Sequence, residues 1–169
     1  MTHATRQEID ALRARAEAGV ASAQFSLGFR YNTGQGVPQD YGEAARWYRL
    51  AADQGQATAQ ANLGVMYADG QGVSQDYVEA VRWYRLAADQ GHARAQGNLG
   101  VMYGTGEGVP QDYVQAHMWF NLAASRRTGE DRETSVSVRD LIAEEMTPDD
   151  LSEAQRLARE WDTAHPREP

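Results

Sequence analysis

Residues 56–91 read QATAQANLGVMYADGQGVSQDYVEAVRWYRLAADQG, and nearly the same 36-residue stretch stands on either side of them. Residues 20–55 share about 25 of the 36 positions with this stretch, and residues 92–127 share about 21. Self-similarity at a fixed period is typical of proteins built from stacked copies of one supersecondary unit. The 169-residue chain therefore contains three tandem copies of such a unit.

The first half of each copy predicts a helix. In residues 20–55, small and apolar side chains recur at the spacing of one buried helical face. These positions are Ala23, Gln24, Leu27, Gly28 and Tyr31. Gly34 and Gly36 with Pro38 then predict a turn, since glycine permits backbone angles that other residues avoid and proline disfavours continued helix.

The second half of each copy predicts a second helix. Asp40 with Glu43 forms an N-terminal capping signal, in which the aspartate accepts from free backbone amides and the glutamate reaches back. An apolar stripe follows, made of Tyr41, Ala44, Trp47, Tyr48 and Ala51. Gly55 and Gly91 stand where a left-handed C-terminal cap is expected.

Neither helix of a copy can bury its apolar stripe alone, so neighbouring copies must stack. We predict an all-α fold, a right-handed superhelical α-solenoid of stacked antiparallel helix pairs that forms one domain over residues 1–169. Residues 1–19 resemble the end of a second helix, with Ala16 in the place of Ala52, and are expected to form an N-terminal capping helix. Large buried areas between helices are expected from the repeated Trp47, Trp83 and Trp119.

The last third of the chain departs from the repeat. Residues 128–165 predict a C-terminal capping helix pair, with a tail at 166–169. Arg127 replaces the capping glycine, and the run from Arg126 to Asp131 is expected to be a lengthened polar turn. The first helix of the pair is indicated by Val138, Leu141, Ile142 and Met146. The second helix starts at Thr147-Pro148 and has an apolar stripe of Leu151, Ala154, Leu157, Ala158 and Trp161.

Composition excludes several classes of function. The net charge of -8 repels phosphate backbones, so nucleic acid is not an expected partner, and no apolar run is long enough for membrane insertion. The chain has no cysteine and all its basic residues are arginine, which excludes thiolate chemistry and Schiff-base lysines. The four histidines stand at no metal-ligand spacing and are expected at the surface. We therefore expect no catalytic residue, no metal and no cofactor.

The repeated positions, written A-x-x-x-L-G-x-x-Y-x-x-G-x-G-V-x-x-D-Y-x-x-A-x-x-W-Y-x-x-A-A-x-x-G, resemble the Sel1-like repeat, a relative of the tetratricopeptide repeat. Three copies cover residues 20–127, and the segment from Met146 to Ala158 resembles the closing segment of bacterial members. The resemblance implies a non-enzymatic adaptor that binds a protein or peptide partner.

The positions that differ between copies indicate where a partner would bind. On the first helices they form a stripe opposite the invariant one, and in a tetratricopeptide-like stack that face lines a concave groove. The predicted contacts are Ser22, Phe25, Ser26, Phe29, Thr58, Asn62, Val65, Asp69, Arg94, Asn98, Val101 and Thr105. Asn62 and Asn98 offer a donor and an acceptor to a peptide backbone, and the Arg94 guanidinium suits a carboxylate.

Other interpretations stay open from the sequence alone. The variable positions could be plain solvated surface, and Phe25 and Phe29 could pack on the leading capping helix. Two other classes of function are an enzyme, such as a β-lactam hydrolase akin to cysteine-rich relatives, and a self-associating structural module. The N-terminus lacks the apolar segment of a secretory signal, so the expected location is cytoplasmic, or periplasmic or secreted if a signal was removed before Met1.

Overall fold

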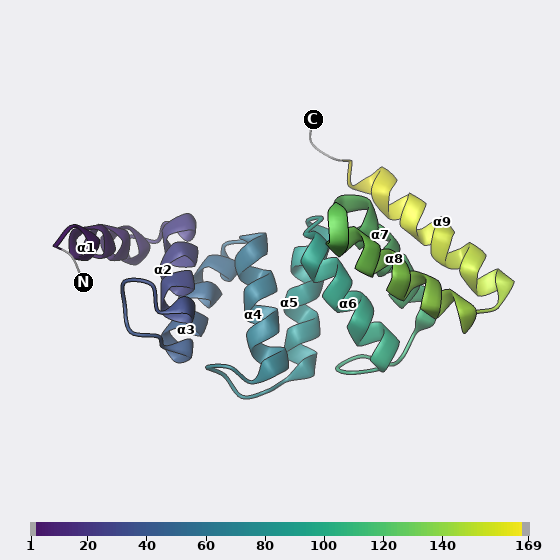
Figure 1. Ribbon diagram of the computed structural model, residues 1–169, viewed down its shortest axis with the longest axis horizontal. Coiled ribbons are helices and arrows are strands. Elements are labelled where there is room, and N and C mark those ends of the chain that lie inside the picture. Colours follow the sequence, from purple (N-terminus) through teal and green to yellow (C-terminus); the bar gives the residue numbers. More distant parts are fainter. Residues whose placement is uncertain (1–2, 167–169) are drawn as a thin grey trace. The chain divides into compact units, whose positions relative to one another are not determined.

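The computed structural model describes residues 3–166, and these residues form nine helices and no strand (Figure 1). The helices are α1 (His3–Glu17), α2 (Ala21–Thr33), α3 (Tyr41–Asp53), α4 (Ala57–Asp69), α5 (Tyr77–Asp89), α6 (Ala93–Thr105), α7 (Tyr113–Arg126), α8 (Gly129–Glu144) and α9 (Pro148–Ala164). The predicted all-α class is confirmed. Over the same residues, no helix is long and apolar enough to cross a bilayer.

The chain divides into two compact units, Met1–Trp83 and Tyr84–Pro169, whose boundary falls inside α5. In unit 1, α2 packs against α1 and α3, and α3 also packs against α4. In unit 2, α7 packs against α6, α8 and α9. Each unit therefore contains its own layers of helices.

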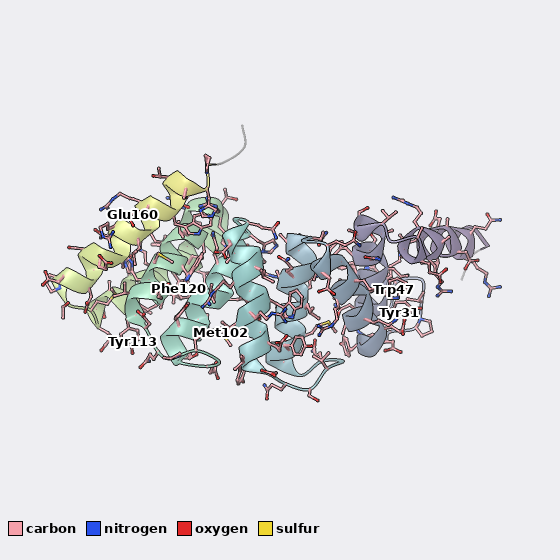
Figure 2. All side chains as sticks on the ribbon, turned by 180° about the vertical axis from the view of Figure 1, so that it is seen from behind. Tyr31, Trp47, Met102, Tyr113, Phe120 and Glu160 are labelled. Atoms are coloured by element: carbon pink, nitrogen blue, oxygen red, sulfur yellow. The ribbon has the colours of Figure 1, made fainter. Side chains whose placement is uncertain are left out.

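Two apolar clusters hold unit 1 together. In one of them, Trp47 of α3 packs against Ala16 of α1 and against Ala23 and Leu27 of α2, with Tyr31 at the edge (Figure 2). The other is built around α3 and α4 and receives Trp83. A tryptophan of the second helix thus fills the space between the two helices that precede it, as expected from its size. In the first cluster, α1 takes the position that the second helix of a preceding copy would have, and its Ala16 packs against Trp47.

A buried glutamine repeats at the start of each first helix. Its side-chain nitrogen donates to a backbone carbonyl near the end of the preceding helix, at 3.1 to 3.2 Å, in the pairs Gln24–Ala16, Gln60–Ala52 and Gln96–Ala88. The last carbonyls of a helix have no partner within the helix. Each of these three carbonyls also accepts from the amide of the glycine that follows the helix, so the invariant glutamine adds a second donor and links the two successive helices.

The N-terminal caps of the second helices are confirmed in part. The Asp40 carboxylate accepts from the amide of Glu43 at 3.0 Å, and Asp76 and Asp112 do the same in their copies. The reciprocal half of the predicted cap is wrong, because the amide of Asp40 donates to the carbonyl of Tyr31 at 2.9 Å. Glu43 pairs instead with Arg46 one turn along the helix.

The glycines of the turns behave as predicted. Gly34 ends α2 in the left-handed conformation at a φ of 72°, and Gly55 follows α3 at a φ of 89°. Arg127, which replaces the glycine after α7, is extended at a φ of -111°. Helix α7 accordingly ends one residue later than α3 and α5 relative to its copy, at Arg126.

The predicted polar turn after α7 is shorter than expected, because α8 already begins at Gly129. Glu130 and Asp131 lie in the first turn of α8, where their negative charges interact favourably with the positive end of the helix dipole. Leu141 is also not a core residue, since its side chain is exposed. Helix α9 starts as predicted, with the Thr147 hydroxyl accepting from the amide of Asp150 at 3.1 Å, and it buries Ala154 and Ala158. The predicted tail, apart from Pro166, lies outside the described residues.

Candidate functional site

The first helices of unit 1, α2 and α4, turn their invariant stripes toward the core. Ala23 and Leu27 of α2 are fully buried, as are Ala59 and Leu63 of α4. Gly28 lets α2 and α3 pack closely, because a Cβ atom at Gly28 would lie only 2.8 Å from Cδ1 of Tyr48. This packing fixes which face of each helix remains accessible.

The structure leaves the predicted contact positions of unit 1 at least partly accessible. Four are exposed, namely Ser22, Phe29, Thr58 and Asp69. Four are half-buried, namely Phe25, Ser26, Asn62 and Val65. Phe29 is the largest exposed apolar side chain among them, with 41% of its surface accessible.

Phe25 is a packing residue. Its ring lies 5.8 Å from the ring of Tyr48, and it contacts the cluster built around α3 and α4. The same position in the next copy, Ala61, is fully buried. Variation between copies therefore does not mark this position as open surface; it marks a place where side chains of different size fill different space.

In unit 2, helix α6 carries the remaining predicted contacts. Arg94, Val101 and Thr105 are exposed, and Asn98 is half-buried. Val101 is 45% accessible and is the counterpart of Phe29. The Thr105 hydroxyl is already used within the chain, where it donates to the carbonyl of Val101 at 3.1 Å.

Sequence reasoning missed Arg127, which directly follows α7 and whose side chain lies beside Gly97 of α6. Its Nη2 lies 3.3 Å from where a Cβ of Gly97 would be, and its Nη1 donates to the Ser135 hydroxyl at 3.1 Å. Burial lowers the pKa of His92 below its ordinary value, and the charges of Arg94 and Arg127 lower it further. Arg94 and Arg127 thus make this end of α6 basic. The signal in the sequence was Gly97, which leaves room for a long side chain where other copies carry a larger residue.

The prediction that all histidines lie at the surface is wrong for His117. It is only 4% exposed, and its counterparts Ala45 and Val81 are buried too. The position faces inward in every copy, although its residue differs. Among the described residues, no group of three or more histidine, cysteine or acidic side chains could hold a metal ion.

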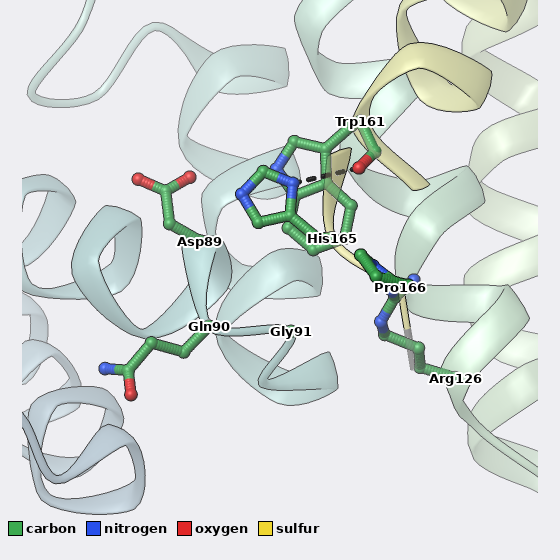
Figure 3. A pocket seen from close by; sticks show the side chains of 7 residues that line it. All are labelled: Asp89, Gln90, Gly91, Arg126, Trp161, His165 and Pro166. Atoms are coloured by element: carbon green, nitrogen blue, oxygen red, sulfur yellow. Dashed lines mark hydrogen bonds between the residues drawn. The ribbon is translucent and has the colours of Figure 1, made fainter. Parts of the chain in front are cut away.

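A hollow of about 650 Å³ lies in unit 2 between the end of α5, α7 and the end of α9 (Figure 3). Its walls are Asp89, Gln90, Gly91, Arg126, Trp161, His165 and Pro166. The rings of Trp161 and His165 stack at 4.1 Å, and the Arg126 guanidinium lies 4.7 Å from the Trp161 ring. Arg126 also forms an ion pair with Asp162 at 2.7 Å. These contacts attach α9 to α7, and they leave the arginine charge compensated.

Comparisons with known proteins agree with this architecture. The family model described as Sel1 repeat matches residues 21–56, 57–92 and 93–127. A comparison with curated protein sequences gave no match.

Two solved structures are similar to the chain. A protective antigen of uropathogenic Escherichia coli strains with an SLR fold is 46% identical over 70% of this chain, at a TM-score of 0.68. A Sel1 repeat protein from Oxalobacter formigenes is 37% identical over 73% of this chain, also at 0.68. The chain spans 25% of the first structure and 47% of the second. With three repeats matched over more than half of its length, the chain belongs to the Sel1-repeat family and has the solenoid fold of that family.

Proposed function

We propose that the chain is a non-enzymatic scaffold that binds a peptide or protein segment through the accessible faces of its first helices. Proteins of the Sel1-repeat family are generally interaction scaffolds, which supports this class of function. The proposed binding elements are α2 and α4 in unit 1 and α6 in unit 2.

The observation that carries the proposal is the division of each first helix into two faces. The invariant residues pack inward, and most residues that differ between copies stay accessible. A solenoid needs the inward face for stacking, whereas the other face is free to vary with the partner. Phe29 and Val101 place an accessible apolar side chain at matching positions of α2 and α6. Apolar anchors flanked by polar groups are typical of peptide-binding surfaces.

The partner contacts are proposed with different roles. Phe29 and Val101 would supply apolar anchoring, and Asn98 and Arg94 would bind the backbone and acidic side chains of the partner. The remaining predicted positions, Ser22, Ser26, Thr58, Asn62, Val65, Asp69 and Thr105, would flank these anchors. Phe25 is left out of the proposed surface because it packs against Tyr48.

The test is selection of peptides from a displayed random library, followed by affinity measurement on the selected peptides. We expect Phe29→Ala with Val101→Ala to weaken binding by about tenfold or more. The matched control is Leu50→Ala with Leu86→Ala, two similarly exposed apolar residues of the second helices, at 39% and 42%. If the Leu50→Ala and Leu86→Ala control loses binding while the Phe29→Ala and Val101→Ala variant keeps it, the partner binds the second helices and the proposed surface is wrong.

The non-enzymatic part of the proposal has its own measurement. We expect nitrocefin turnover by the purified chain to equal that of a heat-treated sample. Turnover above that background, removed by a single substitution, would favour the enzymatic alternative.

A further inference from the structure

A second hollow in unit 2, of about 370 Å³, lies between α7, α8 and α9. We call it the polar hollow, because its walls include His117, Asn121, Arg139, Asp140, Gln155 and Arg159. It is separate from the first-helix surfaces proposed above, so its role does not depend on that proposal.

The charges around the polar hollow do not cancel. Arg139 donates to the Asp140 carboxylate at 2.6 Å and to Asn121 at 3.1 Å, so its charge is compensated. Arg159 forms no ion pair with any residue in the range 3–166. Two guanidinium groups and one carboxylate therefore leave one positive charge in the lining. In a chain with a net charge of -8, this local excess is opposite in sign to the overall charge.

His117 is a buried polar side chain in the wall of the hollow. Its Nδ1 is buried and has no hydrogen-bond partner within the described part of the chain. Buried polar atoms normally have partners, so an orphaned one points to a missing group. Burial lowers the pKa of His117, and the nearby charge of Arg139 lowers it further, against the opposite effect of Asp140. The stacking of repeats does not require an imidazole here, since the counterparts are Ala45 and Val81.

We propose that the polar hollow binds one carboxylate group, carried by a small organic acid or by the C-terminal end of a peptide. The planar carboxylate fits the guanidinium fork of Arg159, and the Gln155 amide can donate to the same group. A single excess positive charge matches a singly charged carboxylate better than a doubly charged phosphate ester.

The test uses calorimetric titration together with nitrogen NMR of the histidine rings. The probes are N-acetylglycine, its neutral amide, and a short peptide prepared with a free and with an amidated C-terminus. We expect the acids to shift the His117 resonances and the amides to leave them unchanged. A bound carboxylate should also raise the pKa of His117, because it adds negative charge to a hollow that His117 lines together with Arg139 and Asp140 of α8 and Arg159 of α9. Binding of N-acetylglycine assigns the small acid as ligand, whereas binding of the free peptide alone assigns a peptide end.

Arg159→Gln should weaken acid binding by about tenfold, as expected for loss of one charge-assisted hydrogen bond. The matched control is Arg156→Gln on the same helix. The Arg156 guanidinium already pairs with Glu153 and Glu160, so its loss should leave acid binding unchanged. Should Arg159→Gln lose its helical circular dichroism, Gln155→Leu gives the same test. Unchanged His117 resonances with every acid, equal binding of the amides, or full binding by Arg159→Gln would each overturn the proposal.

Discussion

Arg139 of α8 donates through Nη1 to Oδ1 of Asn121 on α7 at 3.1 Å, and the two residues are 18 positions apart. The same separation links an arginine to a tyrosine hydroxyl three times earlier in the chain, in the pairs Arg13–Tyr31, Arg49–Tyr67 and Arg85–Tyr103. Asn121 stands where those pairs have arginine, and Arg139 stands where they have tyrosine. Helix α8 therefore continues the 36-residue repeat, but the arginine donor stands at the second position of the pair and the acceptor at the first.

This exchange leads to a prediction about Asn121→Arg, which restores the residue of the other copies. The new guanidinium would lie beside Arg139, and the like charges should reduce the free energy of unfolding by about 1 to 3 kcal/mol. Adding Arg139→Tyr recreates the repeated arginine–tyrosine pair and should recover most of the loss. Urea unfolding of the single and double variants measures both effects. A double variant no more stable than Asn121→Arg would show that residue 139 of α8 does not take the place of the repeated tyrosine.

The turn glycines allow a second prediction, because two of them have similar backbone angles and different surroundings. A Cβ at Gly72 would lie 2.1 Å from the carbonyl oxygen of Tyr41, whereas a Cβ at Gly19 would meet nothing within 4 Å. Both have positive φ, at 70° and 89°. Gly19→Ala should therefore cost about 1 to 2 kcal/mol from backbone strain alone. Gly72→Ala should cost about 3 kcal/mol or more, because backbone atoms must also move.

Thermal unfolding of the two glycine variants provides the comparison. Equal losses of stability would mean that the turn at Gly72 can move away from Tyr41 without cost. A larger loss for Gly19→Ala would contradict the contact geometry itself.

Trp83 provides a third prediction. It is 2% exposed and lies in the cluster with Leu63 and Met66. Trp83→Ala should destabilise the protein by about 3 to 5 kcal/mol, because it leaves a large cavity among helices. The control Leu86→Ala, at an exposed position three residues later, should stay within about 0.5 kcal/mol of the wild type. Chemical denaturation checks both, and a small loss for Trp83→Ala would mean that the cluster collapses around the gap.

The repeat made most of the helices predictable from sequence. Three aligned copies show which positions never change, and in α2 and α4 most of those positions are buried, such as Ala23 and Leu63, while Tyr31 and Tyr67 are half-buried. The start of α9 was predictable from Thr147 and Pro148 for a local reason, since capping depends on neighbouring residues only.

The reverse inference, that varying positions are open, was less reliable. His117 and Ala61 vary between copies and are nevertheless buried. Whether a varying residue is buried depends on which neighbour meets it, and that is a property of packing rather than of periodicity. Arg127 was missed for the same reason: its contacts with Gly97 and Ser135 join segments whose juxtaposition the sequence pattern does not specify.

The last prediction concerns pH and the N-terminal cap of α6. Nδ1 of His92 accepts from the amide of Ala95 at 3.3 Å, which requires that this nitrogen carry no proton. Burial and the charge of Arg94 lower the pKa of His92 below 6.5 in the folded chain. Below pH 6.5 the unfolded chain takes up more protons at this residue than the folded chain does. The stabilisation by the neutral ring is therefore fully present above that pH and is lost as the pH falls toward the folded pKa.

The chain itself suggests the control variant for this effect. Gln56 has the same place in the preceding copy, and its side-chain oxygen accepts from the amide of Ala59 at 2.5 Å. His92→Gln should keep the cap and remove this residue's titration. We expect the melting temperature of the wild type to fall more steeply than that of His92→Gln between pH 7 and pH 5. If the melting temperatures of the two proteins fall equally over that range, the pKa of the His92 ring is the same in the folded and unfolded chains. That result would contradict the lowered pKa of His92 in the folded chain.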